Sequence, residues 1–261
     1  MPSKTEQTSA FLVDLWKKQA RCAGLPAEIQ PASRAEAYAA QALMEGQSAK
    51  PLSGWKIAAT SLAGQKHIGV SGPLAGRYIA ERVVSSGDRV PFGRNHMKVA
   101  EVEFAFRMAQ DLPPRAKAYS EDEVFAAVGT LHPSIEIPDS RFDHFEKVGA
   151  EALIADNACA DWLAIGQAAP DIWRGMDLAA FSPTGSVVGK GEWKGLGINV
   201  LGSPRIAMTW IANELSAIGV TLRKGEIVTT GTCLVPMAIA AGDHVVADYG
   251  PLGRIELHIG A

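Results

Sequence analysis

Residues 100–106, AEVEFAF, alternate acidic and apolar side chains with the period of a β-strand. In a strand, Glu101 and Glu103 share one face, while the valine and the phenylalanines occupy the other. The chain stays largely apolar through Met108 and then reaches a double proline. Two carboxylates therefore lie side by side in a segment whose neighbours belong in a protein core.

A third acid, Glu136, stands between Ile135 and Ile137 in the segment SIEIPDS. Burying a lone carboxylate is costly, and proteins relieve that cost by pairing it, protonating it or binding a metal ion. Three carboxylates on two strands could supply oxygen ligands to a hard divalent cation. The alternative is that all three occupy exposed positions of half-buried strands, because an E-x-E pair is common.

The composition fits an ordinary globular protein. Of its 261 residues, 47% are hydrophobic and 20% charged, which suits one large domain or a domain with a small appendage. The net charge of -3 gives no electrostatic reason to expect nucleic acid or a membrane as a partner. The first ten residues lack the apolar region of a signal peptide, and no apolar run is long enough to span a bilayer. The three cysteines are widely spaced and form no CxxC pair, so we expect a reduced, cytoplasmic protein.

The spacing of apolar residues predicts helices over 9–24 and 33–46. From Gly54 the pattern becomes β-rich, with a loop at 71–76, further helices over 120–131 and 203–219, and a hairpin in the tail. We therefore expect an α+β fold. In it, an N-terminal helical region at 1–52 joins a β-rich catalytic region at 53–261 as one structural unit.

Five segments follow one another along the chain: GWKIAATS, AEVEFAFRM, SIEIPDSRF, LIADNACADWLAIG and LRKGEIVTTGTCLVPMAIAAGDHVVADYGPLG. Together they resemble the fumarylacetoacetate hydrolase superfamily, and within it the branch of 2-hydroxypenta-2,4-dienoate (2-keto-4-pentenoate) hydratases and 4-oxalocrotonate decarboxylases. The resemblance runs from Trp16 to Ile259. It implies a mixed β-roll or barrel core of the fumarylacetoacetate hydrolase C-terminal-domain type, with helices at its N-terminal side.

The resemblance also implies a homo-oligomeric lyase that depends on Mg²⁺ or Mn²⁺. It would act on a small-molecule 2-oxo or 2-hydroxy-dienoic acid in aromatic meta-cleavage catabolism, and a 2-keto-4-pentenoate hydratase-like hydro-lyase is the leading hypothesis. A 2-oxo acid can chelate such an ion, which stabilises an enolate. Hydration, decarboxylation and C–C cleavage all pass through such an enolate, so the metal site alone does not distinguish them.

The family's metal ligands, an E-x-E pair and a later acid, correspond to Glu101, Glu103 and Glu136, and its active-site lysine corresponds to Lys56. A lysine beside the metal would attract an anionic substrate, and it could move protons if burial lowered its pKa. From the sequence alone, Lys56 could equally be a surface lysine at the end of a strand.

The family's T-G-T segment, which lines the substrate end of the pocket, corresponds to Thr230, Gly231 and Thr232. The glycine would let backbone amides approach a carboxylate, and the flanking hydroxyls could donate to it. An ordinary turn, with threonines present for their strand propensity, is the alternative.

Two departures from the family pattern concern the substrate. Hydratases of this branch carry an acid in a stretch resembling V-x-x-P-D-F-G, where this chain has Leu74 after Pro73. Arg77 in the same loop could bind a second carboxylate of the substrate. Cys159 replaces a serine that often follows D-N-A or D-N-G. These changes keep open a decarboxylase, a dicarboxylate substrate or a sibling activity.

Two further alternatives remain. An acylpyruvate C–C hydrolase of the superfamily usually shows an N-Y-x-x-H signature after the lysine strand, and the reading GWKIAATSLAGQKH argues against it. The second alternative is a protein that binds a metal ion or a ligand without catalysing a reaction. Among the remaining polar residues, we expect a structural pair of Asp139 and Arg141, and structural rather than catalytic roles for His67 and His96.

Overall fold

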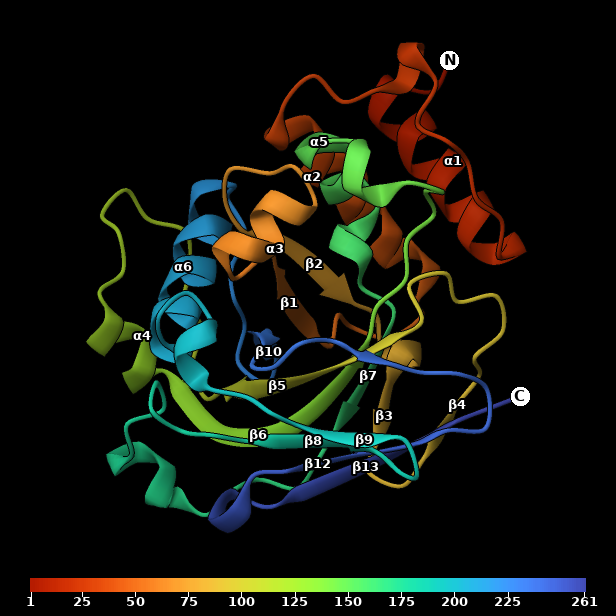
Figure 1. Cartoon of the computed structure of the whole chain (residues 1–261). Helices are drawn as coiled ribbons and strands as arrows, with labels where there is room; N and C mark the ends of the chain where they lie inside the picture. Colours follow the sequence, from red (N-terminus) through yellow and green to blue (C-terminus); the bar gives the residue numbers. More distant parts are fainter.

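A computed structural model describes all 261 residues and places two β-sheets against each other (Figure 1). The larger sheet has eight strands, in the order β2 (Leu74–Tyr78), β1 (Gly54–Ala58), β10 (Ile227–Thr232), β5 (Val99–Met108), β6 (Val128–Ile137), β7 (Trp162–Ile165) and β3 (Val83–Ser85), with β11 (Met237–Ala238) paired to β5. The smaller sheet has five, in the order β4 (Arg89–Val90), β13 (Arg254–Ile259), β12 (His244–Asp248), β8 (Thr184–Val187) and β9 (Gly191–Lys194).

The larger sheet is mixed, so that segments far apart in the chain lie side by side. β1 runs parallel to β10, and β3 runs parallel to β7, while the other neighbours are antiparallel. The two longest strands, β5 and β6, curl across the middle of the fold (Figure 1). This curled, mixed sheet confirms the expected α+β class with a β-roll or half-barrel core.

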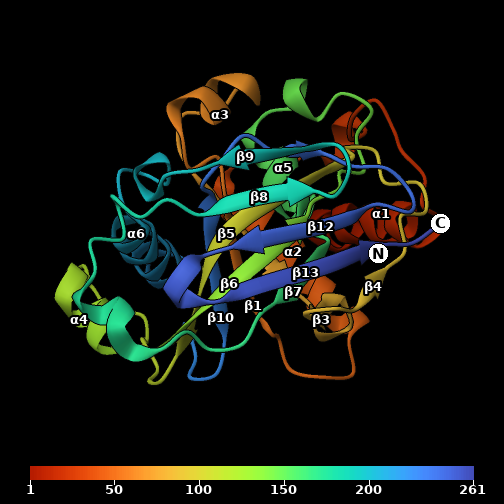
Figure 2. The same ribbon diagram turned by 60° about the horizontal axis from the view of Figure 1, so that its bottom comes forward.

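The core lies between the two sheets. Figure 2 shows β8, β12 and β13 lying across β5 and β6. Phe104 of β5 is fully buried there, and its ring lies 5.4 Å from that of Tyr249 and 5.8 Å from that of Phe181. Aromatic pairs at these distances and in this edge-to-face arrangement add to the stability that burial provides.

Six helices surround the sheets: α1 (Lys4–Lys18), α2 (Arg34–Ala42), α3 (Leu62–His67), α4 (Glu121–Ala126), α5 (Ala150–Ala155) and α6 (Pro204–Ala217). α1, α2 and α5 lie together on one side, and α4 lies beside α6 (Figure 1). Leu12 of α1 and Ala37 of α2 belong to the same buried cluster as the strand residues. The N-terminal helices therefore share the core of the β-rich body. None of the helices is both long and apolar enough to cross a membrane.

Three predicted helices have other bounds than expected, and the one over 33–46 is an α-helix only to Ala42, followed by a 3₁₀ turn. The first begins earlier, at a capping box of Ser3 and Glu6, and stops at Gln19, which adopts the left-handed conformation with φ 49°. The helix predicted over 120–131 stops at Ala126, because β6 begins at Val128 and pairs along β5. The helix over 203–219 and the hairpin in the tail are confirmed.

The segment 71–76 is only partly a loop. From Leu74 it forms β2, which pairs with β1 in antiparallel register. Gly76 allows this because a Cβ there would lie 2.3 Å from the carbonyl oxygen of Asn157. The predicted loop is wrong over this stretch, since the glycine serves close packing rather than a turn.

The prediction that Asp139 pairs with Arg141 is also wrong. Each of the two side chains forms its ion pair with another residue. The guanidinium of Arg141 donates to the carboxylate of Asp156 in a pair that is almost completely buried. Asp139 instead lies 3.0 Å from Nη2 of Arg21.

Replacing Asp156 with asparagine should lower the free energy of unfolding by about 3–5 kcal/mol, because the buried Arg141 would lose its counter-ion. Urea unfolding measures this change. Lys18→Ala is the matched control, since it removes only an exposed pair with Asp14 and should cost less than about 1 kcal/mol. Equally small costs for the two variants would contradict a structural role for the buried pair.

Candidate active site

Three carboxylates meet where β5 pairs with β6. Alternation along β5 places Glu101 and Glu103 on one face, and the register sets Glu136 opposite Glu101. One carboxylate oxygen from each residue lies within 4.8 Å of the others. Glu103 and Glu136 are fully buried, and Glu101 is partly exposed because it lines a cavity. The three acids therefore lie inside the protein and not on an outer surface.

Burial and mutual repulsion both oppose three negative charges at this place. Burial raises the pKa of Glu101 to about 7, with Glu136 adding to the shift and Lys56 opposing it. The pKa of Glu103 is raised well above its ordinary value, first by burial and then by Glu136 and Glu101. The group can carry its full charge near neutral pH only if more positive charge is supplied.

Lys56 supplies one such charge. Its Nζ lies 2.9 Å from Oε1 of Glu136, and its side chain is almost fully buried. Burial by itself lowers the pKa of Lys56, but attraction by Glu136, Glu101 and Glu103 outweighs burial and raises the pKa above its ordinary value. Lys56 is thus neither a surface lysine nor a lysine with a lowered pKa, but a buried cation.

The carboxylates fit a divalent ion that prefers oxygen ligands. Both carboxylate oxygens of Glu136 and Oε1 of Glu103 are buried without a hydrogen bond, and only Oε1 of Glu136 has a cation beside it, the ammonium of Lys56. Buried polar atoms in proteins almost always have a partner. Three carboxylates beside one ammonium also leave two negative charges without compensation. A hard divalent cation such as Mg²⁺ or Mn²⁺ would supply both the partner and the charge.

Glu103 is held in a fixed orientation. The backbone N–H of Gly231 donates to its Oε2 at 2.8 Å. Gly231 has φ +96°, and a Cβ there would lie 2.0 Å from Oγ1 of Thr60, so only glycine fits. The hydroxyls of Tyr249 and Ser134 donate to the backbone carbonyl of Glu103 at 2.6 and 2.7 Å. One carboxylate oxygen of Glu103 is therefore anchored, and the other is free to bind an ion.

A cavity of about 730 Å³ opens beside this group. One end is polar, because Lys56, Glu101 and Thr232 line it. Most of the remaining lining is apolar and comes from β1, β2, α3, α5 and the segments near residues 97, 145, 158 and 235. These apolar side chains are Ile57, Ala58, Ala59, Ala63, Ile68, Leu74, Met97, Val99, Phe145, Leu153, Ala158, Leu234 and Val235.

The predicted T-G-T segment reaches the cavity in part. Gly231 and Thr232 line it, and the hydroxyl of Thr232 donates to the carbonyl oxygen of Leu234 at 2.7 Å. Thr230 does not line it, because its hydroxyl donates at 3.2 Å to the carbonyl oxygen of Phe104 and its side chain is fully buried. Thr230 therefore joins β10 to β5 and does not face the space for a substrate.

Arg77 lies outside the cavity. Its guanidinium packs 4.5 Å from the ring centre of Trp55, donates to Glu45 at 2.7 Å and also donates to Gln41. Leu74 of the same strand lines the cavity, whereas Arg77 points to the opposite face of β2. The predicted contact of Arg77 with a substrate carboxylate is therefore not supported. The arginine instead joins the sheet to the N-terminal helical region.

Cys159 and His67 line the cavity, and His96 does not. Burial raises the pKa of the Cys159 thiol to about 12, so the thiol is neutral. His67 ends α3, with its ring 6.1 Å from that of Phe145. Neither side chain belongs to the group of carboxylates.

Several further residues of the site were not predicted from the sequence. Thr60, Ser61 and Asn199 line the cavity, and Tyr249 supports Glu103 from the end of β12. None of these residues is part of a recognisable catalytic or metal-binding motif. The proximity of Thr60 and Ser61 to Lys56 within GWKIAATS was the only signal that could have indicated them.

Several known proteins resemble this chain in sequence or in fold. No family model matches the chain. The 2-keto-4-pentenoate hydratase 1 of Dechloromonas aromatica (strain RCB) is 30% identical over 258 residues, which cover 97% of this chain and 95% of the relative. The 2-oxo-hept-4-ene-1,7-dioate hydratase of Escherichia coli is 29% identical over 85% of each chain.

A solved structure with the same fold is 4-oxalocrotonate decarboxylase from Pseudomonas putida G7, complexed with magnesium and adipate. It superposes with a TM-score of 0.88 over 98% of this chain and 97% of that chain, at 22% sequence identity. The fold is therefore shared along the whole chain, and the 30% identity to the hydratase extends the relationship to the sequence. The chain belongs to the fumarylacetoacetate hydrolase superfamily, in the branch of the 2-keto-4-pentenoate hydratases and 4-oxalocrotonate decarboxylases.

Proposed function

We propose that the protein is a divalent-metal-dependent hydratase of short 2-hydroxy-dienoic acids, of the 2-keto-4-pentenoate type, in aromatic meta-cleavage catabolism. The observation that carries this proposal is the buried group of Glu101, Glu103 and Glu136 beside Lys56, at the polar end of a mainly apolar cavity. The hydratases among the relatives support the reaction. The magnesium in the decarboxylase complex supports Mg²⁺, or the chemically similar Mn²⁺, as the ion.

Each part of the site has a separate task in this mechanism. When bound by the three glutamates, Mg²⁺ or Mn²⁺ would supply a Lewis acid for the 2-oxygen and the carboxylate of the substrate. Lys56 attracts the anionic substrate and stabilises negative charge that develops at its oxygen. Gly231 fixes the orientation of Glu103. The apolar walls keep bulk water away, which strengthens the electrostatic interactions at the polar end.

Replacing Lys56 with methionine keeps most of the side-chain volume and removes the charge. We expect kcat to fall by about 10²–10³-fold, the usual effect of losing one electrostatic contact to the developing charge. The loss of dienol absorbance in the ultraviolet measures this rate. Lys66→Met is the matched control, because Lys66 is an exposed lysine of α3 that does not line the cavity. An unchanged kcat in Lys56→Met would exclude the proposed role of the lysine.

Replacing Glu136 with glutamine should abolish stoichiometric Mn²⁺ binding, because it removes the charge of a carboxylate whose oxygens accept no hydrogen bond and face only Lys56. Calorimetry or electron paramagnetic resonance of added Mn²⁺ measures this binding without reference to activity. The variant should stay folded, since Glu101 and Glu103 still offset the charge of Lys56. Glu28→Gln, an exposed surface variant, should bind Mn²⁺ like the unmodified protein. Full Mn²⁺ binding by a folded Glu136→Gln protein would rule out the proposed ligand set.

The cavity favours a substrate with one carboxylate and an apolar remainder. Apart from Lys56, its lining contains no lysine or arginine, and Arg77 is occupied elsewhere. A second carboxylate at the apolar end would lose its hydration without gaining a permanent counter-ion. We therefore propose a monoacid, such as 2-hydroxypenta-2,4-dienoate or an alkyl-extended homologue, as the substrate.

Turnover of three compounds tests this proposal: 2-hydroxypenta-2,4-dienoate, 2-hydroxyhexa-2,4-dienoate and the diacid 2-oxohex-3-enedioate, each with Mg²⁺, with Mn²⁺ and with EDTA. We expect both monoacids to be consumed only with metal. The kcat/KM for the diacid should be lower by about a hundredfold, since an unpaired buried polar group costs roughly 1–3 kcal/mol and a charge costs more. Faster loss of the diacid with release of CO₂ would identify a decarboxylase. No turnover of any compound despite bound Mn²⁺ would favour the binding protein without catalysis.

A further inference from the structure

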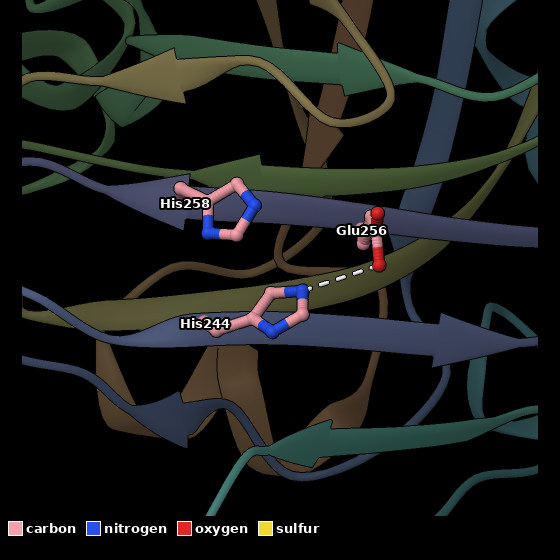
Figure 3. A group of neighbouring side chains, drawn as sticks. All are labelled: His244, Glu256 and His258. Carbon is pink, nitrogen blue, oxygen red and sulfur yellow. Dashed lines mark hydrogen bonds and ion pairs between the residues drawn. The ribbon is translucent and has the colours of Figure 1, made fainter.

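A second group of metal-ligating side chains lies on the smaller sheet (Figure 3). His244 on β12 and His258 on β13 are direct partners in the antiparallel ladder. Glu256 lies two residues before His258, so its side chain is on the same face. All three are partly exposed, while the alternating Val245 and Leu257 are fully buried. The group therefore faces away from the core, where an ion from solution can reach it.

The three side chains are close enough to share one ion. The rings of His244 and His258 stack with their centroids 4.4 Å apart and their planes 20° apart. Nε2 of His244 lies 3.2 Å from Oε2 of Glu256, the contact that is dashed in Figure 3. One ligand atom of each residue lies within 4.8 Å of the other two. A tetrahedral ion with bonds of about 2.0–2.2 Å separates its ligands by about 3.3–3.6 Å, so rotations about side-chain bonds would complete the site.

We propose that His244, Glu256 and His258 bind a transition-metal ion such as Zn²⁺, with water as a fourth ligand. Two imidazole nitrogens and one carboxylate suit Zn²⁺, Ni²⁺ or Cu²⁺, whereas the oxygen-only group on β5 and β6 suits Mg²⁺ or Mn²⁺. The two groups therefore select different classes of ion. An ion held by both strands ties β12 to β13 and stabilises the folded state, because the unfolded chain does not present these ligands together.

Two arginines adjust the affinity of this site. Arg89 of β4 is the ladder partner of His258, and Nη2 of Arg254 lies 4.0 Å from Oε2 of Glu256. Both are positively charged and oppose a bound cation, and Arg254 also competes for the carboxylate. Removing the charge of Arg254 should therefore strengthen metal binding, whereas removing an imidazole should abolish it. This pair of opposite effects would not arise from scattered binding to surface histidines.

Calorimetric titration with ZnCl₂, in Mg²⁺ high enough to fill the glutamates, tests the site on the full chain. The unmodified protein should bind one more Zn²⁺ per chain than either His258→Ala or His244→Ala. Arg254→Gln should bind that ion about two- to fivefold more tightly, the size expected for an exposed ion pair. His144→Ala is the matched control, because His144 is an exposed histidine next to another acid, Glu146. It should keep the full number of zinc ions.

Two further readouts connect the binding to these residues. Zn²⁺ should shift the ring-proton signals of His244 and His258 in NMR spectra, and it should raise the Tm of the unmodified protein but not that of His258→Ala. Equal zinc stoichiometry in the unmodified protein and both histidine variants would overturn the proposal. Zinc-induced shifts confined to other histidines would overturn it as well.

Discussion

The site depends on the electrostatic balance between three carboxylates and one ammonium inside the larger sheet. Burial raises the pKa of Glu101 and of Glu103, and repulsion by Glu136 raises both further, while Lys56 offsets only part of the charge. Such a group persists in a protein only when something else compensates for its cost. The unpartnered oxygens of Glu136 and Glu103 indicate where that compensation enters. The charge balance thus links the architecture of the sheet to the proposed metal dependence.

The mixed topology of the sheet is what brings these groups together. β10 lies between β1 and β5, so that Lys56 on one neighbour and Glu103 on the other flank the strand that carries Gly231. The register of β5 with β6 then sets Glu136 against Glu101. A shift of either strand by one residue would turn its acids toward the opposite face, where Phe104 now packs. The packing of Phe104 and its neighbours therefore fixes the positions of the acids.

The parts of this site that could be predicted from the sequence are those with a local signal. Alternation along 100–106 indicated that Glu101 and Glu103 share a face, and the apolar neighbours of Glu136 suggested it as a third ligand. Only the family resemblance added Lys56 to them. The direction of the pKa shift of Lys56 depends on three acids from other strands, so local burial alone suggested the wrong sign. Arg77 was assigned to a loop, whereas strand alternation in β2 turns it away from the cavity. The hairpin in the tail was predicted, but the sequence did not indicate its register, and the register is what pairs His244 with His258.

The site also separates the chemistry of the polar end from the choice of substrate. Hydration, decarboxylation and C–C cleavage place similar demands on a metal, a lysine and an oriented carboxylate, so the polar end cannot select among them. Selection must come from the walls, and the chain departs from the family pattern there. By the resemblance in sequence, Leu74 corresponds to an acid of the hydratases, and it lines the cavity. The thiol of Cys159, with its raised pKa, stays neutral.

Neither of these wall residues adds charge, so both suit the uncharged part of a monoacid. They also leave the cavity without the usual acid beyond its polar end. Besides Lys56, Glu101 and the neutral Cys159, His67 is the one titratable side chain in the cavity lining. Under the proposed function, a proton exchanged away from the polar end would come from His67, contrary to the structural role expected for it, or from water. Under the proposed function, a leucine in place of that acid would therefore change the route of the proton as well as the choice of substrate.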